Sequence, residues 1–152
     1  MTGATGFIGG VLLGQLAEAG YEVHALYRSG SEHKTNPSYP SVHYIEGDIL
    51  DLKSLRTAMA GCTYVYHMAA YARVWAARPS TFFDINVEGT QNVLSTAYRL
   101  GIKKAVVTST AATLPPSNAH PVNELAEKKI FHTTYEQTKL LSEEVARRFN
   151  HK

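Results

Sequence analysis

Residues 1–10 read MTGATGFIGG, a stretch in which glycine recurs at every third position, at Gly3, Gly6 and Gly9. A turn between a strand and a helix can approach a pyrophosphate only where side chains are absent. The helix that follows offers free N–H groups and the positive end of its dipole. The spacing therefore indicates a phosphate-binding turn, with a glycine-rich surface turn as the alternative. Such a turn normally follows a buried β-strand, whereas only two residues precede it here.

Composition places the chain among globular proteins. Its 152 residues are 44% apolar and 18% charged, enough for one domain with a core. A formal charge of +2 gives no electrostatic case for binding nucleic acid or an acidic membrane surface. The single cysteine, Cys62, excludes a disulfide within the chain and favours a reducing, cytoplasmic setting.

The sequence also lacks the patterns of several other protein classes. No apolar run approaches the ~18 residues of a membrane span, and no basic stretch followed by an apolar one marks an export signal. The seven histidines are scattered and the cysteine has none at ligand spacing, so we expect no metal site.

Helical and strand-like patterns alternate along the whole chain. We predict strands over residues 21–28, 42–48, 63–70 and 103–110, and helices over residues 6–20, 51–61, 79–100 and from 133 to at least 147. Polar loops fill residues 29–41 and the segment after the fourth strand. This alternation predicts an α/β fold with helices on both faces of a parallel sheet. Ligands in such sheets bind beyond the carboxyl ends of the strands.

Two segments carry side chains suited to proton transfer. YEQTK at 135–139 places Tyr135 and Lys139 four residues apart, hence on one face of a helix. A phenol alone is a poor acid–base catalyst at neutral pH, and a fixed ammonium beside it favours the phenolate. The alternative is an ordinary pair on the helix surface. VVTSTAAT at 106–113 predicts a buried strand that ends in hydroxyls, where Ser109 and Thr110 either bind a substrate oxygen or form local turns.

Six motifs occur in an order and approximate spacing that resemble one protein family. They are TGATGFIG at 2–9, GDILD at 47–51, HMAA at 67–70, NVEGTQNVL at 86–94, TSTAA at 108–112 and YEQTK at 135–139. The chain resembles the extended short-chain dehydrogenases/reductases and, within them, the dihydroflavonol reductase-like, NAD-dependent epimerase/dehydratase branch. The resemblance covers essentially the whole chain and implies a Rossmann-like, doubly wound parallel sheet.

The resemblance implies a Ser/Thr–Tyr–Lys catalytic set, which here falls on Thr110, Tyr135 and Lys139. Ser109 is the fallback hydroxyl. Tyr135 and Lys139 are expected to touch the cofactor as well, and Lys139 to hold the nicotinamide ribose. The other positions implied in cofactor binding are Gly3, Gly6, Phe7, Ile8, Gly9, Asp48, Ile49, Met68, Ala69, Ala70, Asn86 and Ser109.

These positions have distinct implied roles. The backbone amides of Phe7 and Ile8 are expected at the pyrophosphate, Asp48 and Ile49 beside the adenine, and residues 68–70 along the cofactor groove. Asn86 is expected to stabilise the site from the long helix. Without the family, Asp48 would be interpreted as an ordinary turn aspartate and Asn86 as a helix-face contact.

The cofactor's 2′ position is read at the end of the strand over 21–28. Sites that prefer NAD usually offer a carboxylate there, whereas this chain has Tyr27 followed by Arg28. A guanidinium suits a 2′-phosphate, so we expect NADP, with NAD as the alternative cofactor. Arg28 could instead stack on the adenine or lie in solvent.

The expected reaction is NADPH-dependent reduction of a carbonyl, with Tyr135 as the acid–base group. One alternative is a nucleotide-sugar epimerase or dehydratase with tightly bound NAD. Another is a non-catalytic dinucleotide-binding protein, against which the retained Tyr135 and Lys139 argue. The expected partner is a small carbonyl compound or a sugar nucleotide, with a homodimer left open.

We expect residues 1–152 to be an incomplete dinucleotide-binding domain. A strand should precede the glycines in the centre of the sheet, between the strands at 22–27 and 63–67. The carboxyl-terminal region that shapes the substrate pocket in the family is also absent from this sequence. We therefore expect residues 1–152 alone to be poorly soluble or molten, to bind NADPH weakly and to catalyse nothing measurable.

Overall fold

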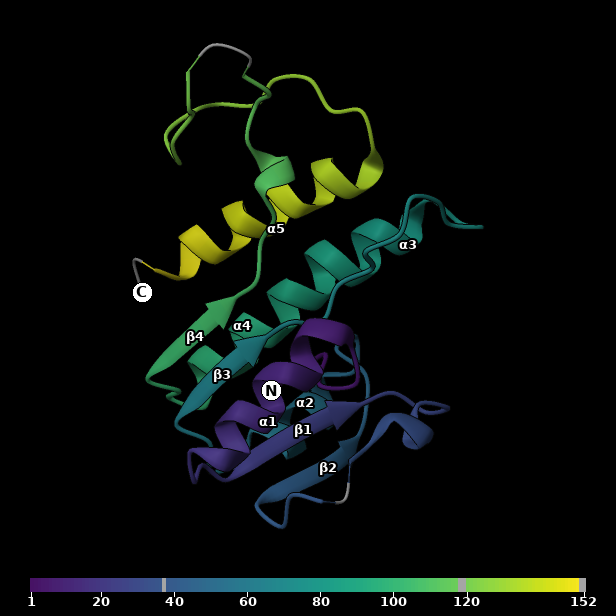
Figure 1. Ribbon diagram of the computed structural model, residues 1–152, viewed down its shortest axis with the longest axis vertical. Helices are drawn as coiled ribbons and strands as arrows, with labels where there is room; N and C mark the ends of the chain where they lie inside the picture. Colours follow the sequence, from purple (N-terminus) through teal and green to yellow (C-terminus); the bar gives the residue numbers. More distant parts are fainter. Residues whose placement is uncertain (37, 118–119, 151–152) are drawn as a thin grey trace.

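Four parallel strands form the sheet in this computed structural model, which describes residues 1–36, 38–117 and 120–150. They are β1 (Val23–Tyr27), β2 (Val42–Glu46), β3 (Tyr64–His67) and β4 (Lys104–Val107). β1 pairs with β2 and β3 pairs with β4, each pair in parallel (Figure 1). All four predicted strands are confirmed, and each is shorter than its sequence pattern.

Met1 and Thr2 lie between β1 and β3 and join the two pairs into one sheet. The Leu26 amide donates to the Met1 carbonyl at 2.9 Å, and the Thr2 amide donates to the Tyr66 carbonyl at 2.9 Å. Thr2 forms parallel bridges to both Leu26 and His67. The glycine-rich turn therefore starts from the middle of the sheet. A strand ahead of the glycines, expected at this central place, stays a prediction.

Helices and short helical turns connect the strands. The α-helices of the described chain are α1 (Phe7–Glu18), α2 (Leu52–Met59), α3 (Ser80–Phe83), α4 (Gly89–Arg99) and α5 (Thr134–Phe149). The short turns are the 3₁₀ turns η1 (Glu32–Lys34) and η3 (Ala111–Thr113) and the π-helical turn η2 (Asp84–Glu88).

Helices cover both faces of β1, because two successive side chains of the strand pack against different helices. Ala25 packs in a cluster with Leu13 of α1, whereas Leu26 packs in a second cluster with Leu55 of α2 and Val93 of α4. Successive side chains of a strand point to opposite faces. Consequently α1 covers one face and α2 and α4 cover the other, where α4 also packs against α5 (Figure 1). The predicted Rossmann-like α/β fold is confirmed.

Helix starts follow local capping signals. Asp51 caps α2 by accepting from the amides of Lys53 at 2.9 Å and Ser54 at 3.2 Å. These hydrogen bonds, that of Lys53 first, lower the pKa of the Asp51 carboxyl. Thr133 caps α5 by accepting from the Glu136 amide at 3.2 Å. Both starts agree with the sequence predictions.

Two expectations about elements need correction. Residues 79–100, predicted as one regular helix, contain the π-helical turn η2 between α3 and α4. The strand predicted as buried over 106–113 ends at Val107, and Val106 is 42% exposed. Ala105 packs against the cluster beneath α2 and α4. Val106 therefore points to the opposite face, where α1 packs against β1 rather than β4.

The predicted polar loops are present, and the first of them contains the unpredicted turn η1. Pro37, Asn118 and Ala119 of these loops lie outside the described residues. Across the described ranges, no helix combines the length and the apolar character that crossing a bilayer would require.

Candidate active site

The glycine-rich turn lies at the carboxyl edge of the sheet, directly after Thr2. Gly3 has a φ of +72°, and a Cβ atom there would come within 2.6 Å of the Ala69 backbone nitrogen. A Cβ atom at Gly9 would come within 2.0 Å of the Gly3 carbonyl oxygen. Only glycine at these two positions lets the turn pack against the loop after β3 and lets α1 begin so close to it.

α1 begins at this turn without a capping side chain. Gly6 is its N-cap residue, and its first turn contains no acidic residue. The first amides of a helix have no partner within it, and the helix dipole favours an anion there. Phe7 and Ile8, whose amides lie in this first turn, have side chains that are 92% and 61% exposed. This geometry can hold a phosphate group at the predicted place.

The loop after β3 runs along the glycine-rich turn. The Met68 amide donates to the Thr2 carbonyl at 3.2 Å, and the Ala69 amide donates to the Thr2 hydroxyl at 3.2 Å. The Met68 sulfur accepts from the Thr108 hydroxyl at 2.7 Å, which joins this loop to the end of β4. The loop at 68–70 thus lies beside the turn, and Ala70 is exposed. Its contact with a cofactor stays a prediction.

Asn86 is buried in the π-helical turn η2 and links two segments of the site. Its side-chain oxygen accepts from the Tyr71 amide at 2.7 Å, and its side-chain nitrogen donates to the Thr138 hydroxyl at 3.0 Å. π-helical turns occur frequently at functional sites. Asn86 therefore ties the loop after β3 to α5, which is a more specific role than a helix-face contact.

α5 carries the predicted proton-transfer pair. Tyr135 lies in its first turn and Lys139 one turn later, on the same face. Lys139 is only 5% exposed, and its ammonium donates to the Thr108 carbonyl oxygen at 2.6 Å. Burial lowers the pKa of Lys139, and the Glu143 carboxylate opposes that shift. The lysine is therefore fixed at the carboxyl end of β4.

Two hydroxyls follow β4 beside this lysine. The Thr110 hydroxyl accepts from the Ala112 amide at 3.3 Å, whereas the Ser109 hydroxyl donates to the Glu143 carboxylate. A hydroxyl has one hydrogen to donate, so Ser109 has used its own and Thr110 retains one for another acceptor. The geometry favours Thr110 over Ser109 as the hydroxyl that meets a substrate oxygen.

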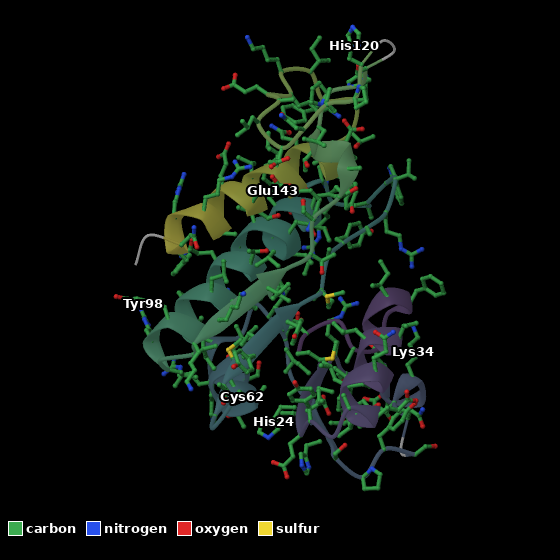
Figure 2. All side chains as sticks on the ribbon, turned by 60° about the vertical axis from the view of Figure 1, so that its left-hand side comes forward. His24, Lys34, Cys62, Tyr98, His120 and Glu143 are labelled. Atoms are coloured by element: carbon green, nitrogen blue, oxygen red, sulfur yellow. The ribbon has the colours of Figure 1, made fainter. Side chains whose placement is uncertain are left out.

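A pocket of about 400 Å³ opens beside these hydroxyls, lined in part by Ser109, Thr110, Glu143 and Arg147. Glu143, labelled on α5 in Figure 2, pairs with Arg147 at 3.0 Å and accepts from the Thr113 hydroxyl at 3.0 Å. Sequence reasoning missed Glu143. The sequence signal for Glu143 is the four-residue spacing of Tyr135 and Lys139, which Glu143 continues by one helical turn on the same face.

Asp48 and Ile49 have mainly local structural roles. The Asp48 carboxylate accepts from the Leu50 amide at 2.9 Å, and the Asp48 amide donates to the Ser54 hydroxyl at 3.0 Å. Ile49 is buried in the core, and its carbonyl accepts from the Asn92 side chain at 3.3 Å. The turn-aspartate interpretation of Asp48 describes this geometry, so a contact with adenine stays a prediction.

Arg28 follows β1 directly and is exposed at the carboxyl edge of the sheet. The preceding Tyr27 packs its ring edge-on against Tyr44, with 6.5 Å between the centroids. Ser29, Gly30 and Ser31 after it carry no carboxylate, whereas that of Glu32 accepts from the Gly30 amide at 2.9 Å.

A buried histidine at the end of β3 was also missed by sequence reasoning. His67 is 2% exposed, with Nδ1 2.7 Å from the Thr2 hydroxyl and Nε2 3.0 Å from the Thr90 hydroxyl. Its signal is a titratable residue inside the apolar pattern TYVYHMAA. Within the described ranges, no three His, Cys, Asp or Glu side chains are grouped to hold a metal ion.

This arrangement of glycine-rich turn, loop after β3 and helix α5 has known counterparts. The model of the NAD dependent epimerase/dehydratase family matches residues 1–152. The chain belongs to this family.

Relatives within the NAD-dependent epimerase/dehydratase family include reductases and dehydratases. The chain is 36% identical over 114 residues to a Synechocystis sp. protein named "Putative dihydroflavonol 4-reductase", covering 75% of this chain and 33% of the relative. It is 33% identical over 149 residues to 2-alkyl-3-oxoalkanoate reductase from Stenotrophomonas maltophilia, covering 95% and 44%. The dTDP-glucose 4,6-dehydratase DesIV from Streptomyces venezuelae, solved with NAD bound, superposes with a TM-score of 0.86 at 26% identity, covering 99% of this chain and 51% of that chain. The chain thus spans about a third to a half of the length of these relatives.

The family implies a nicotinamide dinucleotide, and the residues of the turn fit one. Gly3 and Gly6 leave the backbone bare, and the first amides of α1 have no capping side chain in front of them. The loop at 68–70 forms one side of the turn, and Lys139 lies at the next strand end. These residues could hold the phosphates and the nicotinamide ribose, respectively.

Proposed function

We propose that this protein is an NADPH-dependent oxidoreductase that reduces a ketone or an aldehyde, with Tyr135 as the acid–base group. The observation that carries the proposal is Lys139, a buried ammonium fixed by the Thr108 carbonyl one helical turn beyond Tyr135. Burying a charge is costly, and a buried lysine at the carboxyl edge of such a sheet is a candidate for function on that ground. The shared helix face supports a role for its charge in stabilising the Tyr135 phenolate.

The bound nicotinamide would supply the hydride that reduces the carbonyl carbon. Tyr135 gives its phenolic proton to the carbonyl oxygen, and Lys139 stabilises the phenolate that remains. Thr110 donates its remaining hydroxyl hydrogen to the same oxygen and orients it. Two donors aimed at the oxygen on which negative charge develops lower the barrier more than either would in water.

Arg28 supports NADPH over NADH as the preferred cofactor. Its guanidinium is exposed directly after β1, where a 2′-phosphate of a bound dinucleotide would lie, and the three residues that follow it carry no carboxylate. The Glu32 carboxylate on the same loop is held by the Gly30 amide at 2.9 Å and is the charge that opposes this preference. NAD is the alternative, since the Streptomyces venezuelae dehydratase was solved with NAD.

The proposal is tested with the variant Tyr135→Phe in a complete version of the protein. It should bind NADPH normally and lose about 10²–10⁴-fold in turnover against a panel of ketones and aldehydes, because only the proton donor is removed. NADPH oxidation measures turnover, and nucleotide fluorescence measures binding. The control Tyr21→Phe removes the hydroxyl of an exposed tyrosine after α1 and should behave as the parent. Turnover of Tyr135→Phe within about threefold of the parent would contradict the assignment.

A second candidate is epimerisation or dehydration of a sugar nucleotide with a dinucleotide that stays bound. The structural likeness to the dTDP-glucose dehydratase favours it. Stoichiometry separates the two candidates. A reductase consumes one NADPH for each product molecule, whereas an epimerase or dehydratase turns over many substrate molecules without any added cofactor.

A further inference from the structure

A continuous chain of buried hydrogen bonds leaves the glycine-rich turn through His67. The Ala69 amide donates to the Thr2 hydroxyl at 3.2 Å, and that hydroxyl lies 2.7 Å from Nδ1 of His67. Nε2 of His67 lies 3.0 Å from the Thr90 hydroxyl, which donates to the Asn86 carbonyl at 2.7 Å. The imidazole thus stands between the turn and the long helical segment.

The Asn86 side chain carries the chain of hydrogen bonds on to α5. Its nitrogen donates to the Thr138 hydroxyl at 3.0 Å, and the one hydrogen of that hydroxyl is shared between the carbonyl oxygens of Thr134 at 2.9 Å and Tyr135 at 3.1 Å. The five side chains of the chain are each 2% exposed or less: Thr2, His67, Asn86, Thr90 and Thr138. Water therefore has no access to replace a hydrogen bond that is lost.

The partners of His67 fix a single tautomer. The one hydrogen of the Thr90 hydroxyl goes to Asn86, so Thr90 can only accept from Nε2, which must carry the ring proton. Nδ1 is then bare and accepts from the Thr2 hydroxyl, whose own oxygen accepts from Ala69. Burial, followed by the charge of Lys139, lowers the pKa of His67 to about 3, so the ring stays neutral at pH 7.

We propose that His67 is a positioning residue that couples the glycine-rich turn to the catalytic helix through this one tautomer. Its Nδ1 holds Thr2, and with it the loop at Ala69, while its Nε2 holds Thr90 and the Asn86–Thr138 link to α5. Phosphate binding at the turn and the placement of Tyr135 and Lys139 are therefore set together. The inference rests on the proposed dinucleotide binding and adds to it a coupling between the two halves of the site.

A substitution at Thr90 can show whether α5 and the glycine-rich turn are coupled, because Thr90 itself is not hydrogen-bonded to the turn. It belongs to α4 and reaches the turn through His67. Thr90→Val keeps the shape of the side chain and leaves the Nε2 proton buried without an acceptor. Thr2→Val acts on the other ring nitrogen and leaves the bare Nδ1 buried without a donor. Thr96→Val is the matched control, because it makes the same change at another buried threonine of α4, outside the chain of hydrogen bonds.

Binding of ADP to the full protein is the first measurement. ADP carries adenosine and two phosphates but lacks the nicotinamide half, so it can occupy the turn without touching Lys139. Calorimetry should give an affinity about tenfold weaker for Thr90→Val and at least tenfold weaker for Thr2→Val, which also removes the acceptor of the Ala69 amide. The double variant should lose no more than Thr2→Val alone, because both changes act on one imidazole. Thr96→Val should bind as the parent does. An affinity of Thr90→Val within twofold of the parent, in a parent that binds ADP, would overturn the coupling while leaving the proposed function intact. A folded parent that binds neither ADP nor NADPH would overturn both.

Two further measurements test the coupling without reference to activity. ADP should slow amide hydrogen exchange across residues 134–139 in the parent and in Thr96→Val, and not in Thr90→Val. Slowing confined to the turn in the parent would also overturn the coupling. The ¹⁵N spectrum of the His67 ring should show a protonated Nε2 and a bare Nδ1 from pH 8 to pH 5. A ring protonated at Nδ1, or at both nitrogens, would overturn the assignment whatever the protein binds.

Discussion

Adjacent glycines in α1, Gly9 and Gly10, should respond to alanine in opposite directions. A Cβ atom at Gly9 would lie 2.0 Å from the Gly3 carbonyl oxygen, about 1.4 Å short of the 3.4 Å at which ordinary contact begins. The atom in the way is backbone, so the turn or the helix must move. At Gly10 the nearest atom outside the helix would be the Ala4 carbonyl oxygen at 3.5 Å, an ordinary contact.

These contacts set the magnitudes. Alanine in place of a helical glycine gains about 0.5–1 kcal/mol from chain entropy, and both variants receive that gain. Overpacking at Gly9 costs roughly 1–3 kcal/mol, so the two variants should differ by about that amount. In a domain of this size, each kcal/mol shifts Tm by roughly 2–4 °C. Gly10→Ala should therefore melt slightly above the parent, and Gly9→Ala clearly below Gly10→Ala.

The assay combines differential scanning calorimetry with NADPH titration by fluorescence. Gly9→Ala displaces the turn by about an ångström, and NADPH binding should weaken at least tenfold, whereas Gly10→Ala should bind within twofold of the parent. If both variants melt within 1 °C of each other and bind NADPH equally, the close approach of α1 to Gly3 is not what requires glycine at position 9.

Three further predictions concern charge. Arg28→Ala should weaken NADPH binding by roughly 1.5–3 kcal/mol and NADH binding far less, because only NADPH has a 2′-phosphate. Arg99→Ala is the control. Equal losses for both nucleotides would contradict the role of Arg28. Because the pKa of His67 is about 3 when folded and ~6.5 when unfolded, the unfolded chain binds more protons below pH 6.5. The free energy of unfolding should fall by about 2 kcal/mol between pH 7 and pH 5, and urea titrations of His67→Gln should lack that decrease. Glu143→Gln keeps an acceptor for Ser109 and Thr113 but removes the charge that raises the pKa of Lys139. Its alkaline limb of activity should move to lower pH, and an unmoved limb would mean that Lys139 does not set it.

Much of the fold was predictable because its signals are local. Glycine spacing, the Asp51 cap and the alternation of periodicities each depend on a few neighbouring residues, and the strands and helices confirm them. The π-helical turn η2 was not predictable, since no residue type in Asp84–Glu88 marks the point where the helix takes up an extra residue. The exposure of Val106 also depends on which helix covers which strand, and that is a property of the assembled sheet.

The candidate site divides in the same way. The Tyr135–Lys139 spacing is a property of one helix, so the sequence indicates it directly. His67 and its two partners come from three separate segments, and no spacing in the sequence places Thr2, Thr90 and a strand-end histidine together. Asp48 is a different case, because its carboxylate accepts from the Leu50 amide within its own turn, and the contact with adenine that the family motif suggests stays a prediction.

The hydrogen bond between Thr2 and His67 also affects when the turn can fold during synthesis. The two residues are 65 positions apart, and Asn86 and Thr138 are 52 apart. A ribosome adds about 5–20 residues each second, so roughly 3–13 s pass between the synthesis of the turn and that of the histidine. Parallel pairing across such separations is slow, because chain entropy is lost before any contact compensates for it. The turn is therefore synthesised seconds before the strand that gives it its shape, and a growing chain carries it unformed through that interval.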